Sequence, residues 1–238
     1  MQNDKKENGD FFHVFSDVSF PVARPANDKI LLVAGSCGSL ANIKVSASEQ
    51  KRADGMRHEG SRERFLAGRR IVRGILSEWL SRAPGDLEIS IGSDGKPGLK
   101  DGSDCHFSIA HSGDLILAAF SSVPLGVDTE EAREVDALGL ARRFFSPSEI
   151  SAVLEDSSRF FPLWTRREAA VKADGRGLAQ TLPLTTSDIV HSGSWGPVRI
   201  GDFSWQTIAW RDGGHHLALA VETIPSAILW CDLRGVIW

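Results

Sequence analysis

The chain has 238 residues, of which 42% are hydrophobic, and this is enough for one large core or two smaller ones. A formal net charge of −4 excludes the strongly basic composition of general nucleic-acid-binding domains, so no nucleic-acid partner is expected. No segment approaches the ~20 apolar residues of a membrane helix, and the N-terminal MQNDKKENGD lacks the apolar centre of a signal peptide, so we expect a cytoplasmic protein without membrane contacts.

The N-terminal half predicts strands around one long helix. After a polar tail of ten residues, apolar stretches predict strands at 11–15, 30–34, 87–91, 106–110 and 115–120. From Ser48 to Ser81 the pattern becomes helical, with apolar residues from Phe65 to Leu80 at three- and four-residue spacings, which predicts one helix that ends before Pro84-Gly85.

The C-terminal half shows the same mixture of helices and strands. Helices are predicted at 134–143, 147–155 and 159–174, and strands at 125–130, 187–190, 203–211 and 215–222. The pattern predicts an α+β fold with a boundary near Ser122–Leu125, which gives halves 1–122 and 123–238. No sequence repeat links the halves, and the absence of a long linker predicts that they pack together.

Basic residues gather on the long predicted helix. The cluster consists of Arg62, Arg64, Arg69, Arg70 and Arg73, with Lys51 and Arg52 just upstream. A cationic region in an acidic chain suits phosphates or an acidic protein partner. The alternative for each arginine is a solvated position on a helix surface.

Two acids lie on the strand at 125–130. Alternation along a strand places Asp128 and Glu130 on one face, with Val127 and Thr129 on the other. Magnesium suits such a pair, because it takes oxygen ligands and commonly binds one or two carboxylates together with substrate phosphates. The alternative is an exposed, solvated acidic strand end.

A second cluster lies on the helix at 159–174. Glu168 and Lys172 are four residues apart, so they share a face, and a surface ion pair contributing about 0.2–0.5 kcal/mol would explain them. The functional interpretation makes Glu168 a metal ligand or base and Lys172 a partner for phosphate.

Five motifs occur together in a recognisable order. They are Gly95-Lys96-Pro97, FSIAHSG at 107–113, GVDTE at 126–130, RRFFSPSE at 142–149 and WTRREAAVKADGRGL at 164–178. In this order the chain resembles the surfactin-type 4′-phosphopantetheinyl transferases, closely over about 48–180 and elsewhere only by strand pattern.

The resemblance implies a pseudo-twofold pair of similar α+β subdomains, each with helices on a small antiparallel sheet and with coenzyme A between them. Asp128, Glu130 and Glu168 match the acids that hold magnesium against the coenzyme A pyrophosphate, and Asp128 also counts among the coenzyme A contacts. The implied contacts to coenzyme A from basic and neighbouring positions are Arg64, Lys96, Pro97, His111 and Lys172, with His111 on the 3′-phosphate.

The implied activity is that of a holo-[acyl-carrier-protein] synthase or 4′-phosphopantetheinyl transferase. Such an enzyme moves the 4′-phosphopantetheine moiety of coenzyme A, its co-substrate, to a serine of an apo acyl or peptidyl carrier protein and releases adenosine 3′,5′-bisphosphate. Glu168 and Lys172 are the implied catalytic residues, with Glu168 as the candidate base. Two halves in one chain predict a complete site in a monomer.

Three positions depart from the family pattern. Ala110 stands where serine usually precedes His111, Arg167 where lysine is common, and Thr129 where the residue between the acids is usually apolar. Loss of the serine hydroxyl predicts weaker coenzyme A binding unless backbone N–H groups replace it.

Several residues have structural explanations. Ser146 and Glu149 fit a helix capping box, so Glu149 is left out of the site. His191, His215 and His216 lack acids or cysteines at ligand spacing and are interpreted as non-functional. Two other functions stay open: a non-catalytic homologue that binds coenzyme A or carrier proteins, and a metal-dependent phosphohydrolase.

Overall fold

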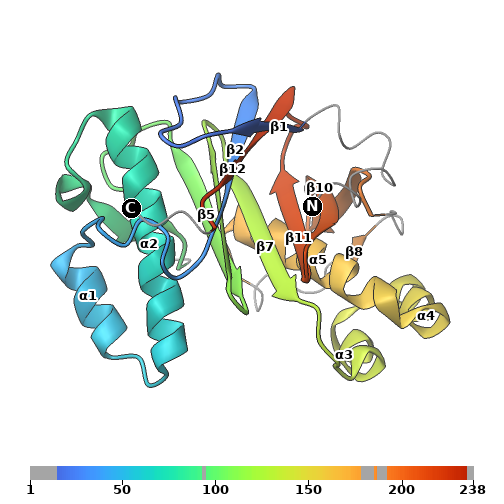
Figure 1. Cartoon of the computed structure of the whole chain (residues 1–238). Helices are drawn as coiled ribbons and strands as arrows, with labels where there is room; N and C mark the ends of the chain where they lie inside the picture. The colour runs from blue at the N-terminus through green and yellow to red at the C-terminus, as the bar shows by residue number, and fades with distance from the viewer. Residues whose placement is uncertain (1–14, 93–94, 178–184, 187–191, 235–238) are drawn as a thin grey trace.

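The computed structural model describes residues 15–92, 95–177, 185–186 and 192–234 (Figure 1). The helices are α1 (Ala47–Asp54), α2 (Glu59–Leu80), α3 (Ala137–Phe144), α4 (Pro147–Glu155) and α5 (Phe160–Asp174), with 3-10 turns at Pro84–Asp86 and Ser157–Arg159. The first six strands are β1 (Phe15–Val18), β2 (Lys29–Gly35), β3 (Ile89–Ile91), β4 (Pro97–Leu99), β5 (His106–Ser112) and β6 (Leu115–Ser121). The others are β7 (Leu125–Glu131), β8 (Thr185–Thr186), β9 (Gly196–Ile200), β10 (Phe203–Asp212), β11 (His215–Val221) and β12 (Ala227–Asp232).

The fold is mixed α+β, with two five-stranded sheets and a small β3–β4 hairpin. The first sheet has the order β1-β12-β2-β6-β5, and the second has the order β7-β11-β10-β9-β8. The second sheet is antiparallel throughout, but β12 runs parallel to both β1 and β2 in the first sheet. The expectation of an antiparallel sheet is therefore wrong for the first sheet, because the last described strand inserts there between β1 and β2. The division at residue 122 stays a prediction.

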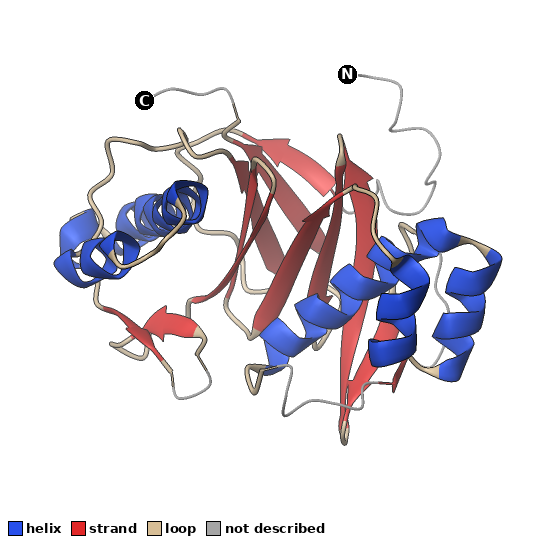
Figure 2. Ribbon diagram, turned by 90° about the horizontal axis from the view of Figure 1, so that it is seen from below, coloured by secondary structure: helices blue, strands red, loops and turns tan. Residues whose placement is uncertain are grey.

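The fold has four layers, in the order helix, sheet, sheet, helix, because the strands of both sheets are buried on both faces. The two sheets pack on each other through an apolar cluster that includes Leu32, Leu117, Val127 and Leu219. Helix α2 covers the outer face of the first sheet, and α5 covers that of the second. Figure 2 shows the helices on both flanks of the strands. Within the described ranges no helix is long and apolar enough to cross a membrane.

The single helix predicted from Ser48 to Ser81 is two helices in the structure. Helix α1 starts at a capping box in which the Ser46 side chain accepts from Glu49 N and Glu49 accepts from Ser46 N, and it ends at Gly55. Helix α2 starts at Glu59 after a short turn. The prediction was wrong at this point because the apolar stripe on which it rested, from Phe65 to Leu80, lies entirely in α2, whereas the polar α1 ends separately at its C-cap Gly55.

Most other predicted elements are confirmed within a few residues. The predicted strand at 187–190 lies outside the described residues, as does the strand at 11–15 except at Phe15. Strands β4, β8, β9 and β12 were not predicted. The helix predicted at 134–143 begins at 137, because the Asp136 carboxylate accepts from Gly139 N and acts as the N-cap.

The two parts of the chain share an order of elements. In the first part, β2 is followed by α1, α2, β5 and β6, and the three strands lie in the sheet order β2-β6-β5. In the second part, β7 is followed by α4, α5, β10 and β11, and the three strands lie in the sheet order β7-β11-β10. The capping box at Ser46 and Glu49 recurs at Ser146 and Glu149. Each box glutamate binds a buried arginine of the next helix, Arg73 in α2 or Arg167 in α5.

Candidate functional site

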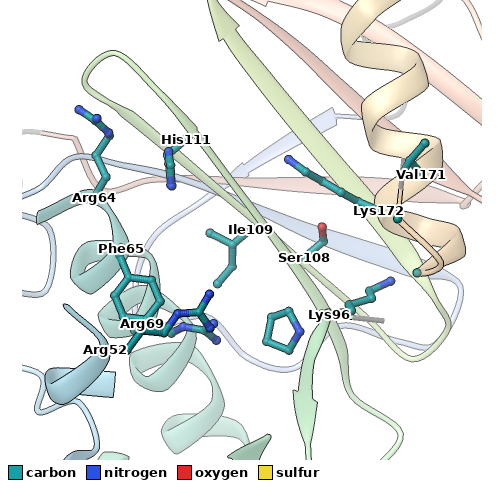
Figure 3. Close-up of a pocket in the computed structure, with 14 residues that line it drawn as sticks. Arg52, Arg64, Phe65, Arg69, Lys96, Ser108, Ile109, His111, Val171 and Lys172 are labelled. Carbon is teal, nitrogen blue, oxygen red and sulfur yellow. The ribbon is translucent and has the colours of Figure 1, made fainter. Parts of the chain in front are cut away.

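A pocket of about 300 Å3 lies where α2, β4 and β5 meet the C-terminal part of α5 (Figure 3). Its described lining residues are Arg52, Arg64, Phe65, Arg69, Gly95, Lys96, Pro97, Ser108, Ile109, His111, Val171, Lys172, Gly175 and Gly177. Basic side chains dominate this lining, and none of these lining residues is acidic. The pocket therefore favours an anionic ligand.

Five of the predicted site residues line this pocket. They are Arg64, Lys96, Pro97, His111 and Lys172. They come from both parts of the chain, so the fold brings together positions more than one hundred residues apart in sequence. Desolvation lowers the pKa of His111, and the positive charges of Arg64 and Lys172 act in the same direction, whereas a hydrogen bond with its own backbone partly opposes them.

Lys96 lies in the turn of the β3–β4 hairpin and connects this hairpin to β7 and α5. Its Nζ donates to the carbonyl oxygen of Leu125, at 3.0 Å, and to that of Ala173, at 3.2 Å. Ala173 is in the last turn of α5, where a cation is favoured by the helix dipole. Lys96 therefore holds the start of β7 and the end of α5 together beside the pocket.

The close packing of α5 on β7 depends on Gly126. A Cβ at this position would lie 2.0 Å from the carbonyl oxygen of Ala169 and 2.4 Å from the amide nitrogen of Ala173. Only glycine leaves room for the helix backbone at this distance. The contact places Lys172 of α5 beside Asp128 of β7.

Lys172 forms an ion pair with Asp128 on β7, although the sequence places Glu168 on the same face of its own helix. Its Nζ lies 2.7 Å from Asp128 Oδ1, and the Asp128 side chain is buried. Burial raises the pKa of Asp128, Lys172 opposes that shift, and the Glu130 charge adds to it. Burial also raises the pKa of Glu168, with a further increase from Asp128. The two strand acids and Glu168 thus lie close enough to influence one another.

Glu130 is held by residues that the sequence did not single out. Its Oε2 accepts from Ser112 Oγ, at 3.1 Å, and from Arg133 Nη1, at 2.9 Å. Ser112 Oγ also accepts from Glu131 N, at 2.9 Å, so one side chain at the end of β5 fixes the end of β7. The only sequence signal for Ser112 is its position after His111.

The three acids offer the oxygen donors that magnesium prefers, and Asp128 Oδ2 is buried without a hydrogen-bond partner. The residues present therefore fit a magnesium ion in the type of donor atom that they offer. In the described part of the chain, however, no group of three or more His, Cys, Asp or Glu side chains is arranged to hold a metal ion. The metal assignment of Asp128, Glu130 and Glu168 stays a prediction.

Two departures from the family pattern have structural explanations. Ala110 is 3% exposed and belongs to the apolar cluster between the sheets, outside the pocket lining, so a hydroxyl at this position would enter the core. Arg167 is buried and donates to both carboxylate oxygens of Glu149, at 3.0 and 2.8 Å, and to the Phe144 carbonyl oxygen. Glu149 thus has the structural role that its capping box predicts.

The histidines after the last tight turn also make structural contacts. His215 Nε2 lies 3.0 Å from the Ser112 carbonyl oxygen, and His216 stacks on Phe161 with ring centres 5.3 Å apart. Sequence reasoning also missed Phe65 and Arg69 as pocket residues. Arg69 appeared only as one member of the arginine cluster, because no sequence pattern separates it from the other four arginines, which are half-buried or, at Arg73, buried. His191 lies outside the described residues.

Comparison with known proteins gives a consistent assignment. The profile of the 4′-phosphopantetheinyl transferase superfamily matches residues 124–221. The chain is 35% identical over 150 residues to 4′-phosphopantetheinyl transferase ffp of Bacillus subtilis, covering 61% of this chain and 66% of that protein. It is 32% identical over 196 residues to 4′-phosphopantetheinyl transferase HetI of Nostoc sp., covering 70% of this chain and 83% of that protein. It is 38% identical over 133 residues to 4′-phosphopantetheinyl transferase AcpT of Escherichia coli O157:H7, covering 53% of this chain and 65% of that protein.

Proposed function

Because the chain belongs to the 4′-phosphopantetheinyl transferase superfamily, we propose that it transfers the 4′-phosphopantetheine moiety of coenzyme A to a serine of an apo carrier protein. The observation that carries this proposal is the cationic pocket directly beside three interacting acids. The class is that of the holo-[acyl-carrier-protein] synthases, with an acyl or peptidyl carrier protein as the partner.

Coenzyme A suits the pocket in charge. Its nucleotide part carries a pyrophosphate and a separate phosphomonoester, and the lining offers Lys96 and Lys172 together with several arginines. The volume of about 300 Å3 is at the lower end of the usual range for small-molecule sites, so part of the ligand would extend toward solvent. The pantetheine arm and the carrier protein would approach from that open side.

Asp128, Glu130 and Glu168 would hold magnesium in this site, and Lys172 would then turn from Asp128 toward phosphate. When bound, the ion would neutralise charge on the pyrophosphate and on the departing nucleotide. The buried, unpartnered Asp128 Oδ2 supports this donor set.

The chain's own residues supply a base and a counter-charge. The carrier serine oxygen forms a bond to the phosphorus that carries pantetheine, while the bond from that phosphorus to the bridging oxygen breaks. Adenosine 3′,5′-bisphosphate leaves with the electron pair, and the serine proton passes to the Glu168 carboxylate. Burial raises the pKa of Glu168 in the metal-free protein, and a magnesium ion bound to this carboxylate would act in the opposite direction. Lys172 would stabilise the negative charge on the leaving group.

The two parts of the chain form a pseudo-twofold pair of subdomains in this proposal. Support comes from the matching strand orders β2-β6-β5 and β7-β11-β10 and from the two capping boxes with their buried arginines. Residues from both parts line one pocket within one chain, so a monomer would carry a complete site.

Mass spectrometry of intact carrier proteins tests the function. The protein is mixed with coenzyme A, magnesium and a panel of apo carriers, and a gain of ~340 Da that a chelator prevents is the expected result. Glu168→Gln should abolish the gain, while Glu155→Gln on the exposed surface of α4 should preserve it. Coenzyme A binding without any gain would favour a non-catalytic binding protein, and coenzyme A cleavage without an acceptor would favour a phosphohydrolase.

A further inference from the structure

The Ser112 hydroxyl connects the end of β5 to the end of β7 through two hydrogen bonds of opposite direction. Its Oγ accepts from Glu131 N, at 2.9 Å, and donates to Glu130 Oε2, at 3.1 Å. A serine hydroxyl has one proton to donate, so the bond from the amide leaves that proton for the carboxylate. One side chain therefore fixes both the backbone of β7 and the carboxylate of Glu130.

The bond to Glu130 is not needed to connect the two strands. Four residues earlier on the same face of β5, Ser108 Oγ accepts from Val127 N, at 3.1 Å. Val127 and Glu131 are also four residues apart, so both serines contact β7 in the same register. Ser108 shows that a strand-to-strand contact requires only the accepted bond, and the bond that Ser112 donates to Glu130 is additional.

Two adjacent acids at the end of β7 are directed to different places. Alternation along the strand sends Glu130 and Glu131 to opposite faces. A Cβ at Gly113, in the turn between β5 and β6, would lie 2.7 Å from the carboxyl carbon of Glu131, so glycine leaves the space for this side chain. Ser112 contacts the carboxylate of Glu130 instead, and the geometry therefore distinguishes one acid from its neighbour.

The two donors to Glu130 differ in charge. Ser112 and Arg133 both donate to Oε2, so these two contacts leave Oε1 for another partner. Arg133 is 52% exposed in its side chain, and its positive charge opposes the approach of a cation. Ser112 is neutral, so it orients the carboxylate without neutralising it. A neutral donor is the one that suits a carboxylate with a cation as its ligand.

We propose that Ser112 is a positioning residue for the metal ion, because it holds Glu130 by Oε2 and keeps Oε1 for the ion. This inference rests on the proposed function, in which Glu130 is one of three magnesium ligands. A glutamate side chain loses rotamer freedom when it binds, and a carboxylate that is already oriented loses less. Ser112 would therefore set the affinity for the ion and not the rate of transfer once the ion is bound.

Electron paramagnetic resonance of free Mn2+ tests this role in the nucleotide-free protein. Ser112→Ala should weaken Mn2+ binding about tenfold, because residues that orient a metal ligand have effects of this size. Ser112→Thr retains the hydroxyl and should stay within about threefold of the wild type. Ser112→Cys fills the same space with a weaker donor, so it should resemble Ser112→Ala and replaces that variant if it does not fold.

A double-mutant cycle separates positioning from a general effect on the structure. In the Glu130→Gln background, Ser112→Ala should change the Mn2+ affinity less than about twofold, because Ser112 acts through that carboxylate. Glu131→Gln is the matched control for loss of a carboxylate from β7. Ser121→Ala is the control for loss of a serine bond to a backbone amide, here that of Val123. Both controls should bind Mn2+ within about twofold of the wild type.

Transfer kinetics provide a second measurement. The magnesium concentration for half-maximal transfer should rise about tenfold in Ser112→Ala. At saturating magnesium, kcat and the KM for coenzyme A should change less than about threefold, because the oriented carboxylate contributes to ion binding and not to the later steps. A fall in kcat that saturating magnesium does not restore would contradict a positioning role.

The outcomes distinguish this inference from the proposed function. Equal Mn2+ affinity in Ser112→Ala and the wild type would overturn the inference alone. An undiminished effect of Ser112→Ala in the Glu130→Gln background, or an equal loss in Ser121→Ala, would do the same, because the hydroxyl would then not act through Glu130. Absence of both Mn2+ binding and transfer in the wild-type protein would overturn the proposed function.

Discussion

Lys172 Nζ lies 2.7 Å from Asp128 Oδ1, so an ammonium group on α5 neutralises a buried carboxylate on β7. In the proposed reaction the same two side chains would serve different charges, with Lys172 on phosphate and Asp128 on a metal ion. The ion pair therefore competes with divalent metal for Asp128 when no phosphate ligand is bound.

Replacing Lys172 by methionine should reveal this competition. We expect Lys172→Met to strengthen Mn2+ binding to the nucleotide-free protein about tenfold, because Asp128 loses its ammonium partner. The same variant should bind adenosine 3′,5′-bisphosphate more weakly and lose transfer. Electron paramagnetic resonance of free Mn2+ measures the metal affinity directly. Lys100→Met at an exposed ion pair is the control, and weaker metal binding by Lys172→Met would contradict the competition.

Gly126→Ala should disrupt the contact between α5 and β7. A Cβ would meet the Ala169 carbonyl oxygen at 2.0 Å, so the helix must shift and carry Lys172 away from Asp128. We expect a loss of about 3 kcal/mol or more in the free energy of unfolding and loss of transfer. Urea unfolding measures the first effect. Gly38→Ala, where a Cβ meets no atom within 4 Å, should cost little. Equal stability of both variants would show that the packing tolerates the methyl group.

Ala110→Ser should not improve nucleotide binding. The new hydroxyl would lie in the apolar cluster between the sheets, where burying it without a partner costs about 1–3 kcal/mol. Calorimetric titration should give an unchanged affinity for adenosine 3′,5′-bisphosphate, while the melting temperature falls. A tenfold gain in affinity would show that this side chain reaches the ligand and that the expectation from the family pattern was correct.

Arg167 should be essential to stability. Glu149 is fully buried and both of its oxygens accept from Arg167, so Arg167→Met would leave a buried carboxylate unpaired at a cost of about 3–5 kcal/mol. Arg167→Lys keeps the charge but loses the Nη2 hydrogen bond to the Phe144 carbonyl oxygen, and we expect an intermediate loss of about 2 kcal/mol. Urea unfolding of both variants measures these two losses in the free energy of unfolding and tests which is larger. The double variant Arg167→Met with Glu149→Leu should recover part of the loss, and a further loss would contradict the pairing.

His216 should make the protein less stable in mild acid. Burial, with help from the charges of Arg211 and His215, lowers the pKa of His216 to about 4. Because the unfolded chain takes up a proton near pH 6.5 and the folded chain does not, stability is present above that pH and falls as the pH drops. Between pH 7 and pH 5 the loss is about 2 kcal/mol.

His216→Phe is the variant that isolates this effect. The phenyl ring can keep the stack on Phe161 but cannot titrate. Its free energy of unfolding should therefore fall about 2 kcal/mol less than that of the wild type between pH 7 and pH 5. Replacement of the exposed His58 by phenylalanine should leave the wild-type dependence unchanged. Parallel pH profiles for wild type and His216→Phe would refute the assignment.

The sequence by itself determined the mixed α+β class, the segments with clear periodicity and the family. These are local properties: alternation places Asp128 and Glu130 on one face of a strand, and a four-residue spacing places Glu168 and Lys172 on one face of a helix. The motif order also led to the pocket residues Lys96 and His111. The split between α1 and α2 was missed, because the apolar stripe lies only in α2 and no apolar pattern in the polar segment before it indicates where a helix ends.

Only the tertiary structure decided which side chains meet across the fold. It paired Lys172 with Asp128, placed Ala110 in the core and left Arg69 with an incomplete set of partners in the pocket. It also returned β12 to the first sheet between β1 and β2. Each of these outcomes depends on contacts between residues far apart in the chain. Such contacts are set by packing and by the burial of charge, which neither periodicity nor composition encodes.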